Sequence, residues 1–247
     1  MKTSYKIKVM EIIEFLKRKF YILRPLLRPF YKTFIANKQE SMRRSVFQNN
    51  AINVLDAFDK AMKTGGYHYT LAFGSLLGAV REGGFIKHDL DIDTAMWAED
   101  YNDRLQETLR DFGFKRIHCY TVDKGVSARE ETYEKDGVSI DIFYIYPAID
   151  EYPYCCDFLN HYGKESVSEA MKRYSNNMVA RRIQLPMSHD IQYTAFESLY
   201  LPIPKNAEQI LAFRYGADYM TPNPNWSMVG SYDKNITIWE GKKVVSE

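Results

Sequence analysis

Residues 67–81 have the sequence YHYTLAFGSLLGAVR, in which a β-rich segment runs directly into a helix-like one. Residues 67–73 are aromatic and β-branched, which predicts a strand. After Gly74 and Ser75, residues 76–81 show helical periodicity. Strand, tight turn and helix in this order leave backbone N–H groups at a positive helix end, where phosphate oxygens can be held. We therefore expect Gly74 and Ser75 to face an anionic ligand.

Two acids alternate with apolar residues in the next extended segment, Leu90-Asp91-Ile92-Asp93. Alternate residues of a strand share a face, so the carboxylates of Asp91 and Asp93 are predicted to lie side by side. Such a pair repels itself unless a cation lies between its members. A hard divalent ion, Mg²⁺ or Mn²⁺, takes one or two carboxylates and completes its shell with phosphate oxygens and water. Asp89 shares this face if the strand extends that far, as a metal ligand or as a residue that orients one.

A third acid follows in a predicted hairpin. Residues 126–133 and 138–146 are strand-like, and the Asp-Gly pair at 136–137 is typical of a tight turn between them. Asp141, in the second strand, is flanked by apolar residues and can complete a three-carboxylate site for one or two metals. It is also the natural candidate for the general base that acts on an acceptor hydroxyl.

The first 45 residues differ in charge from the remainder. They carry 12 Lys and Arg against 3 Asp and Glu, which leaves 21 of the 33 basic and 29 of the 32 acidic residues to the remaining chain. We therefore predict a basic amphipathic helical extension over 1–45 and a catalytic domain over 46–247. The extension is too often interrupted by charge to cross a bilayer. Its composition suits an anionic membrane surface, and it equally suits a helix packed on the domain or bound to a protein partner.

The remaining pattern predicts an α+β fold with a mixed sheet flanked by helices. Helices are expected over 40–66, 99–113, 166–180 and 207–213, and a further strand over 114–122. The interval 147–205 shows no other clear periodicity. Three cysteines form no even disulfide framework, which favours a reducing compartment. The acidic catalytic portion argues against nucleic acid as a partner.

The run from Phe73 to Asp93 resembles the signature of the LicD family, which includes the fukutin-related proteins. Residues 201–204 and 214–222 are similar to that family's closing segments, so the resemblance covers about residues 67–225 in the same order. The chain departs from the family pattern where residues 87–88 replace Pro-Trp and where Leu90 replaces the middle acid of the acidic run. These changes lie in the loop beside the metal ligands and leave both acids of the pair in place.

The resemblance implies a nucleotidyltransferase-like fold and a Mg²⁺-dependent transfer of an alcohol phosphate, such as phosphocholine or ribitol phosphate. The donor would be a CDP-alcohol, and the acceptor a sugar hydroxyl of a cell-surface glycan or its lipid-linked precursor. Carried over by position, Gly74 and Ser75 would contact donor phosphates, and Arg81 and Lys87 lie where cations could meet the diphosphate. An exposed helix residue and a loop residue are the alternative interpretations of these last two.

Two alternative functions stay open at this point. One is nucleotidyl transfer from an NTP with release of pyrophosphate, and the other is a scaffold in glycan assembly without turnover. The leading hypothesis is a cytoplasmic enzyme held at the inner face of the membrane by its basic extension.

Overall fold

In this computed structural model, the structure describes residues 38–87, 89–149, 151–159, 178–223, 236–239 and 244–246. Most of the predicted basic extension lies outside that part of the chain. The domain boundary after residue 45 and the membrane contact of the extension therefore stay predictions. None of the helices in the described ranges has the length and apolar character needed to cross a membrane.

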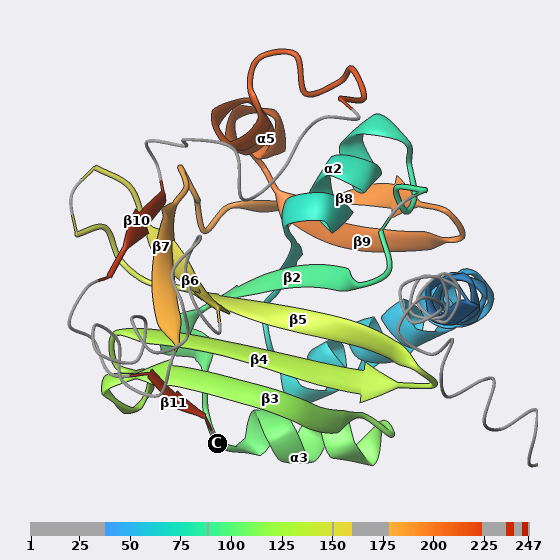
Figure 1. Cartoon of the computed structure of the whole chain (residues 1–247), viewed down its shortest axis with the longest axis horizontal. Coiled ribbons are helices and arrows are strands. Elements are labelled where there is room, and N and C mark those ends of the chain that lie inside the picture. Colours follow the sequence, from blue (N-terminus) through green and yellow to red (C-terminus); the bar gives the residue numbers. More distant parts are fainter. Residues whose placement is uncertain are drawn as a thin grey trace, which may run out of the picture. The chain divides into compact units, whose positions relative to one another are not determined.

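The fold is built around a six-stranded sheet with the strand order β1-β2-β5-β4-β3-β11 (Figure 1). Its strands are β1 (Thr70–Leu71), β2 (Ile92–Trp97), β3 (Lys115–Val122), β4 (Ala128–Lys135), β5 (Val138–Ile145) and β11 (Val244–Ser246). Strands β2 and β5 run parallel, and all other neighbouring pairs are antiparallel. The predicted mixed sheet with flanking helices is confirmed.

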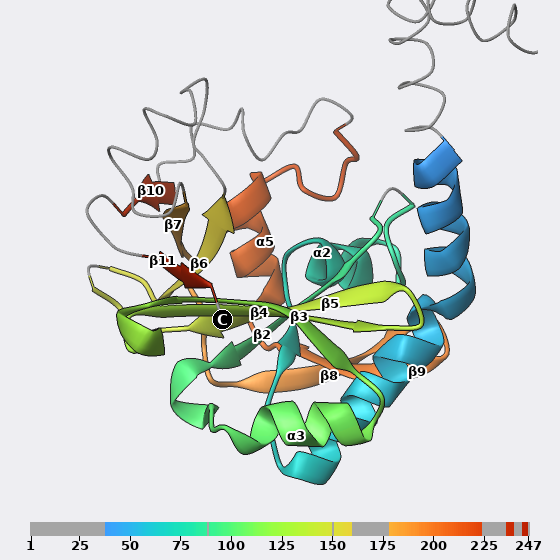
Figure 2. The ribbon, with the colours of Figure 1, turned by 60° about the horizontal axis from the view of Figure 1, so that its bottom comes forward.

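Helices cover both faces of this sheet. Figure 2 shows α2 (Phe73–Arg81) and α5 (Ala207–Tyr215) on one side and α3 (Arg104–Asp111) on the other. The helices predicted over 40–66 and 207–213 are confirmed, the first with bounds 38–65. The prediction over 99–113 is correct only for α3, because the 3₁₀ turn η1 (Ala98–Asp100) and an extended residue precede it. A second 3₁₀ turn, η2 (Asp123–Gly125), follows β3.

The strand predicted over 67–73 is shorter than expected. Only Thr70 and Leu71 pair with β2, and the helix already begins at Phe73, whose φ is +40°. Gly74 and Ser75 therefore lie in the first turn of α2 and not in a loop before it. The aromatic residues that suggested a longer strand, Tyr67 and Tyr69, are buried in the core instead, which is why composition overstated the strand.

The turn between β4 and β5 is the one expected from the sequence. Asp136 has φ +51° and Gly137 has φ +77°. Two consecutive residues with positive φ form the turn whose twist matches the two strands of a hairpin, and Asp-Gly tolerates it best. The hairpin is confirmed with strands at 128–135 and 138–145.

Two smaller sheets occupy the interval that showed no clear pattern. One has the order β10-β7-β6, formed by β6 (Tyr154–Leu159), β7 (Val179–Gln184) and β10 (Ile236–Ile238), and the other pairs β8 (Ile191–Phe196) with β9 (Leu199–Pro204). Most of the helix predicted over 166–180 lies outside the described residues. The predicted end of this helix is wrong, because β7 already begins at Val179. The backbone of β7 pairs with β6 on one side and with β10 on the other.

The two faces of the large sheet differ in character, and the strand pairing identifies them. The core face, on the side of α3, carries Cys119, Glu131, Tyr133, Ile142 and Tyr144, all of which are buried. The acid face, on the side of α2, carries Asp93, Asp141, Thr132, Glu130, His118 and Tyr120. Side chains of paired residues point to the same face of a sheet. Polar chemistry is thus concentrated on the acid face.

Glu131 is the one carboxylate embedded in the middle of the described core face, at 1% exposure. Its Oε1 accepts hydrogen bonds from Arg129 (2.9 Å) and Arg116 (3.3 Å), and its Oε2 accepts from the hydroxyls of Tyr133 (3.0 Å) and Tyr144 (2.9 Å). Both oxygens are satisfied and the charge is balanced, as burial of an ion requires. This network is structural.

Candidate active site

Strand β2 and helix α2 are joined through Asp93. The backbone N–H of Gly74 donates a 3.0 Å hydrogen bond to Asp93 Oδ2, and the backbone N–H of Asp93 donates a 2.9 Å bond to Ser75 Oγ. The first turn of the helix therefore orients the second acid of the pair. In this arrangement Gly74 and Ser75 hold Asp93, and their contact with donor phosphate stays a prediction.

Glycine is required at position 74 for a steric reason. A Cβ added there would lie 2.6 Å from Asp89 Oδ2 and 3.2 Å from Asp93 Oδ2. A separation below 3.0 Å means that the Asp89 carboxylate would have to shift to make room for a side chain. Two carboxylate oxygens, from the segment before β2 and from β2 itself, thus lie against the first turn of α2 at Gly74.

The predicted third acid lies next to Asp93. Asp93 and Asp141 are direct neighbours on the parallel strands β2 and β5. Asp141 Oδ1 accepts a 2.6 Å hydrogen bond from Thr132 Oγ1 on β4, which fixes its carboxylate. Asp91 lies one residue before β2 begins and is exposed. The four acids named from the sequence therefore meet on one face, although Asp91 is not part of the strand itself.

The electrostatics of the site reflect this crowding of negative charge. Burial raises the pKa of Asp93 well above its ordinary value, the charges of Asp91 and Asp141 raise it further, and the Gly74 N–H opposes the shift. Burial also raises the pKa of Asp141 to about 6, against the lowering effect of the Thr132 hydrogen bond; Asp91 adds to the increase and His118 reduces it. Each acid destabilises the charged form of its neighbours.

A divalent cation fits this donor set chemically. The acids offer hard oxygen ligands, and the pKa values of Asp93 and Asp141 are raised by burial and, in addition, by the charges of neighbouring acids. Among the described residues, no group of three or more acidic, His or Cys side chains lies close enough together to hold a metal ion by itself. An open set of two carboxylates is the usual protein share of a Mg²⁺ shell that is completed by phosphate and water.

The cationic residues expected beside the donor are placed differently from one another. Arg81 ends α2, where its guanidinium bonds to Glu82 Oε1 (2.8 Å) and to the Tyr219 carbonyl (3.4 Å). Lys87 is exposed in the loop between α2 and β2. Arg81 is thus oriented by two contacts at the end of α2, whereas the side chain of Lys87 lies on the surface, and contact of either with a diphosphate stays a prediction.

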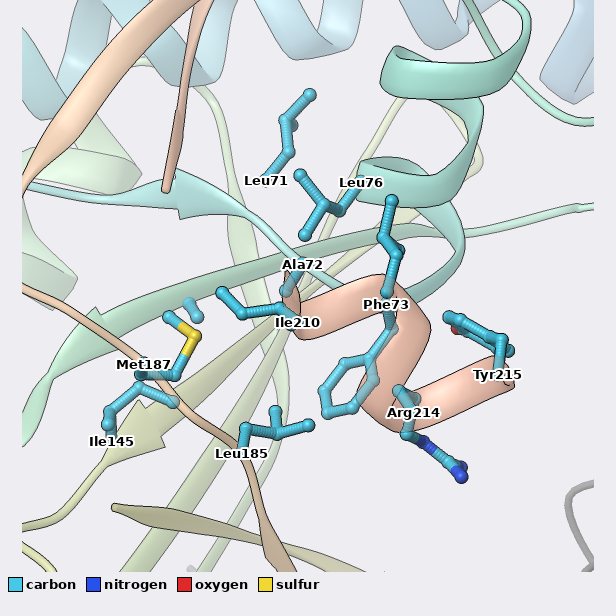
Figure 3. Close-up of a pocket in the computed structure, with 12 residues that line it drawn as sticks. Leu71, Ala72, Phe73, Leu76, Ile145, Leu185, Met187, Ile210, Arg214 and Tyr215 are labelled. Atoms are coloured by element: carbon cyan, nitrogen blue, oxygen red, sulfur yellow. The ribbon is translucent and has the colours of Figure 1, made fainter. Parts of the chain in front are cut away.

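Helix α5 carries Arg214 and Tyr215 at its end, beside a narrow apolar pocket. Apolar side chains of α2, α5 and the β5 end pack around a narrow pocket, and the Arg214 guanidinium points away from them (Figure 3). Burial raises the pKa of Tyr215, and the charges of Asp93 and Asp89 add to that effect, so its hydroxyl lies near the acids. The surface of this pocket is apolar. Its side chains pack α5 in place, and they present no hydrogen-bonding group to a phosphate.

Glu130 is a further acid of the site that the sequence did not reveal. It lies on the acid face of β4, two residues from Thr132, and its enclosed Oε2 makes no hydrogen bond. Burial raises its pKa well above the ordinary value, and the nearby charges of Asp141 and Asp157 raise it further. In the sequence Glu130 stands beside Glu131 in an acidic run. Consecutive residues of a strand point to opposite faces, and the pairing of β4 shows which face each of the two glutamates occupies.

The comparisons with known proteins agree with this geometry. The sequence model of a family described as LicD/FKTN/FKRP, nucleotidyltransferase domain, matches residues 66–206, which contain all four predicted acids. The chain is 26% identical over 125 residues to the ribitol-5-phosphate transferase FKTN of Macaca fascicularis, and 27% identical over 106 residues to that of Mus musculus. An uncharacterised protein of Caenorhabditis elegans, W02B3.4, is 36% identical over 83 residues.

These alignments cover 50%, 42% and 31% of this chain. The chain spans about a quarter of the length of these relatives: 26%, 23% and 21%. The similarity therefore concerns one segment of each relative.

Proposed function

Because this chain belongs to the LicD/FKTN/FKRP family of nucleotidyltransferase domains, we propose that it transfers an alcohol phosphate from a CDP-activated donor to a sugar hydroxyl. The printed names of two similar proteins, ribitol-5-phosphate transferases, support this class of reaction. The acceptor is a glycan or a glycolipid, and the reaction depends on Mg²⁺ or Mn²⁺.

A single observation carries the proposal: Asp93 is held between the first turn of α2 and Asp141 of β5, with two further acids at the same place. Asp91 and Asp93 would hold the cation, and Asp89 would assist them. When bound, the cation supplies a positive charge that binds the donor phosphates and draws electrons from the phosphorus. We further propose that Arg81 and Lys87 contact the diphosphate, as their positions in the family pattern imply.

Asp141 is the proposed general base. In the transfer, the acceptor oxygen forms a new bond to the phosphorus of the alcohol phosphate, and the phosphoanhydride bond to CMP breaks. The hydroxyl proton passes to Asp141, whose carboxylate is oriented by Thr132. A base with a pKa of about 6 is largely ionised at neutral pH yet basic enough to accept that proton. Positioning and electrostatics carry the remaining catalysis.

The donor assay tests this proposal. Purified protein is incubated with Mg²⁺ and a panel of CDP-alcohols and NTPs, with and without EDTA, while release of CMP and pyrophosphate is followed. We expect metal-dependent CMP release that is lost in Asp91→Asn and Asp93→Asn. The matched control is Asp111→Asn, an exposed acid at the end of α3 on the far side of the sheet, which should leave the rate unchanged.

Two other results would redirect the proposal. Pyrophosphate release from an NTP would make the protein a nucleotidyltransferase. Binding of a CDP-alcohol without any turnover would favour the scaffold role. For location, we propose a cytoplasmic protein held at the inner face of the membrane by residues 1–45; equal sedimentation with anionic liposomes by the full chain and by a chain starting at Val46 would contradict this.

A further inference from the structure

Two aromatic rings stack on the acid face of β3. The rings of His118 and Tyr120 are nearly parallel, at 12°, with centroids 5.5 Å apart, and the Tyr120 hydroxyl shares a 3.4 Å hydrogen bond with His118 Nδ1. Tyr120 also contacts Phe158 of β6, with centroids 5.7 Å apart. His118 is exposed and Tyr120 is half-buried. The pair is thus a fixed, partly open aromatic surface.

The strand register places this surface in line with the reacting acids. Asp93 pairs with Asp141, Asp141 with Thr132, and Thr132 with His118, across four consecutive strands. Neighbouring strands are about 4.8 Å apart, so β3 lies about 10 Å from β5. His118 is close enough to Asp141 to lower the pKa of its carboxyl slightly, which agrees with the strand register.

The geometry of the transfer decides which substrate approaches from this side. In phosphoryl transfer the attacking and leaving oxygens are roughly in line on opposite sides of the phosphorus. The helix end that faces the donor belongs to α2, which lies beside β1 and β2. Asp141 lies on the other side of Asp93, toward β4 and β3. The leaving CMP therefore belongs on the α2 side, and the acceptor must enter over β4 and β3.

We infer that His118 and Tyr120 form the binding surface for the acceptor sugar, a pyranose whose apolar C–H face lies against the rings and whose hydroxyl points to Asp141. This inference rests on the proposed transfer reaction and adds to it the location and the chemical class of the acceptor subsite. Rings with one apolar face and a polar edge suit a sugar, because they bury its C–H groups and offer hydrogen bonds to its hydroxyls.

A second aromatic pair in the described residues serves as the control. Tyr193 and Tyr200 of the β8–β9 hairpin lie at 19°, with centroids 5.8 Å apart, and are 43% and 65% exposed. This pair belongs to a separate two-stranded sheet and is not in register with any of the acids. The Tyr193 and Tyr200 pair is therefore a similar aromatic surface at a different place in the fold.

The test separates acceptor binding from donor chemistry. A panel of methyl glycopyranosides is offered as acceptors with the best CDP-alcohol, and transfer product is measured separately from CMP released to water without acceptor. We expect His118→Ala and Tyr120→Ala to raise the acceptor KM at least tenfold, while the donor KM and the acceptor-free CMP release stay within twofold of wild type. Tyr200→Ala should behave like wild type, whereas Tyr120→Phe, which keeps the ring and loses the hydroxyl, should raise the acceptor KM less than Tyr120→Ala does.

Several outcomes would overturn the inference. An unchanged acceptor KM in both alanine variants, a raised donor KM instead, or an acceptor effect of Tyr200→Ala would each place the sugar elsewhere. CMP release without transfer to any pyranoside would contradict the acceptor class. If wild type releases no CMP from any donor, the proposed reaction itself fails, which is a different result from normal release with an unmoved acceptor KM.

Discussion

Glu130 and Glu131 are consecutive residues of one strand, yet they lie in opposite electrostatic environments. Glu131, on the core face, receives four hydrogen bonds, two of them from arginines. Glu130, on the acid face, has an enclosed oxygen without a hydrogen bond and lies near Asp141 and Asp157. The fold thus neutralises the buried charge of Glu131 with two arginines. The next residue, Glu130, points to the opposite face, where it lies close to other carboxylates.

The difference indicates where the molecule gives up stability for function. An unbalanced group of acids destabilises the folded chain, because each charge raises the free energy of the others. Such an arrangement persists where a ligand supplies the missing charge. The core face holds the sheet together, and we propose that a cation and a phosphate complete the acid face.

Asp93→Asn should produce the largest functional effect. It removes a proposed metal ligand, so we expect CMP release to fall at least about a thousandfold. Because it also removes a crowded buried charge, the metal-free variant should have a Tm equal to or above that of wild type. Scanning calorimetry in EDTA, together with the donor assay, measures both. A variant that loses Tm and activity together would show that Asp93 is mainly structural.

Glu131→Ala should do the reverse. It leaves Arg129 and Arg116 without their shared buried partner, and breaking such a network costs about 3 to 5 kcal/mol. Urea unfolding monitored by circular dichroism measures the loss. The exposed neighbour Glu134 is the matched control, since Glu134→Ala should change stability by less than about 0.5 kcal/mol. A small loss in Glu131→Ala would mean that the core face is not held by this network.

The acid face predicts an unusual dependence of stability on pH. With its pKa raised to about 6, Asp141 keeps a proton in the folded state that the unfolded chain has already lost above about pH 4. Folding then binds protons, so in EDTA stability should fall as pH rises from about 4 to 6, by about 3 kcal/mol from this residue. Calorimetry from pH 4.5 to 7.5 measures the slope, and Asp141→Asn should flatten it. A slope of opposite sign would show that the acids are already balanced.

Gly74→Ala should lower stability less than Glu131→Ala does and should also lower activity. The new methyl group would collide with Asp89 Oδ2, and overpacking of this kind costs about 1 to 3 kcal/mol. Gly83→Ala is the control, because a Cβ there meets nothing within 4 Å, although its φ of +67° adds some strain. If both variants retain full activity, the close approach at Gly74 is not needed by the site.

The sequence predicted the local parts of this site well. The helix after Gly74, the strand that contains Asp93 and the Asp-Gly turn before Asp141 are properties of short segments, and the backbone follows them as local chemistry predicts. There are two exceptions: Asp91 lies just before β2, and in the strand before Gly74 buried tyrosines and not strand pairing account for the aromatic residues.

The parts that escaped prediction depend on contacts between distant segments. Glu130 and Glu131 are the same residue type in one acidic run, and their opposite environments follow from the register of β4 against β3 and β5. Tyr215 comes near Asp93 and Asp89 because α5 packs against α2. Strands β6 to β9 are short and poorly patterned, so single-sequence periodicity did not identify them.

Direct measurement of metal binding tests the central claim, that the acid face is completed by a divalent cation. Isothermal titration calorimetry with Mg²⁺ and Mn²⁺ at pH 7.5 would compare wild type, Asp93→Asn and the distant control Asp111→Asn. We predict saturable binding to wild type and to Asp111→Asn, and none to Asp93→Asn. Binding of equal strength and stoichiometry in all three proteins, or in none of them, would contradict the account.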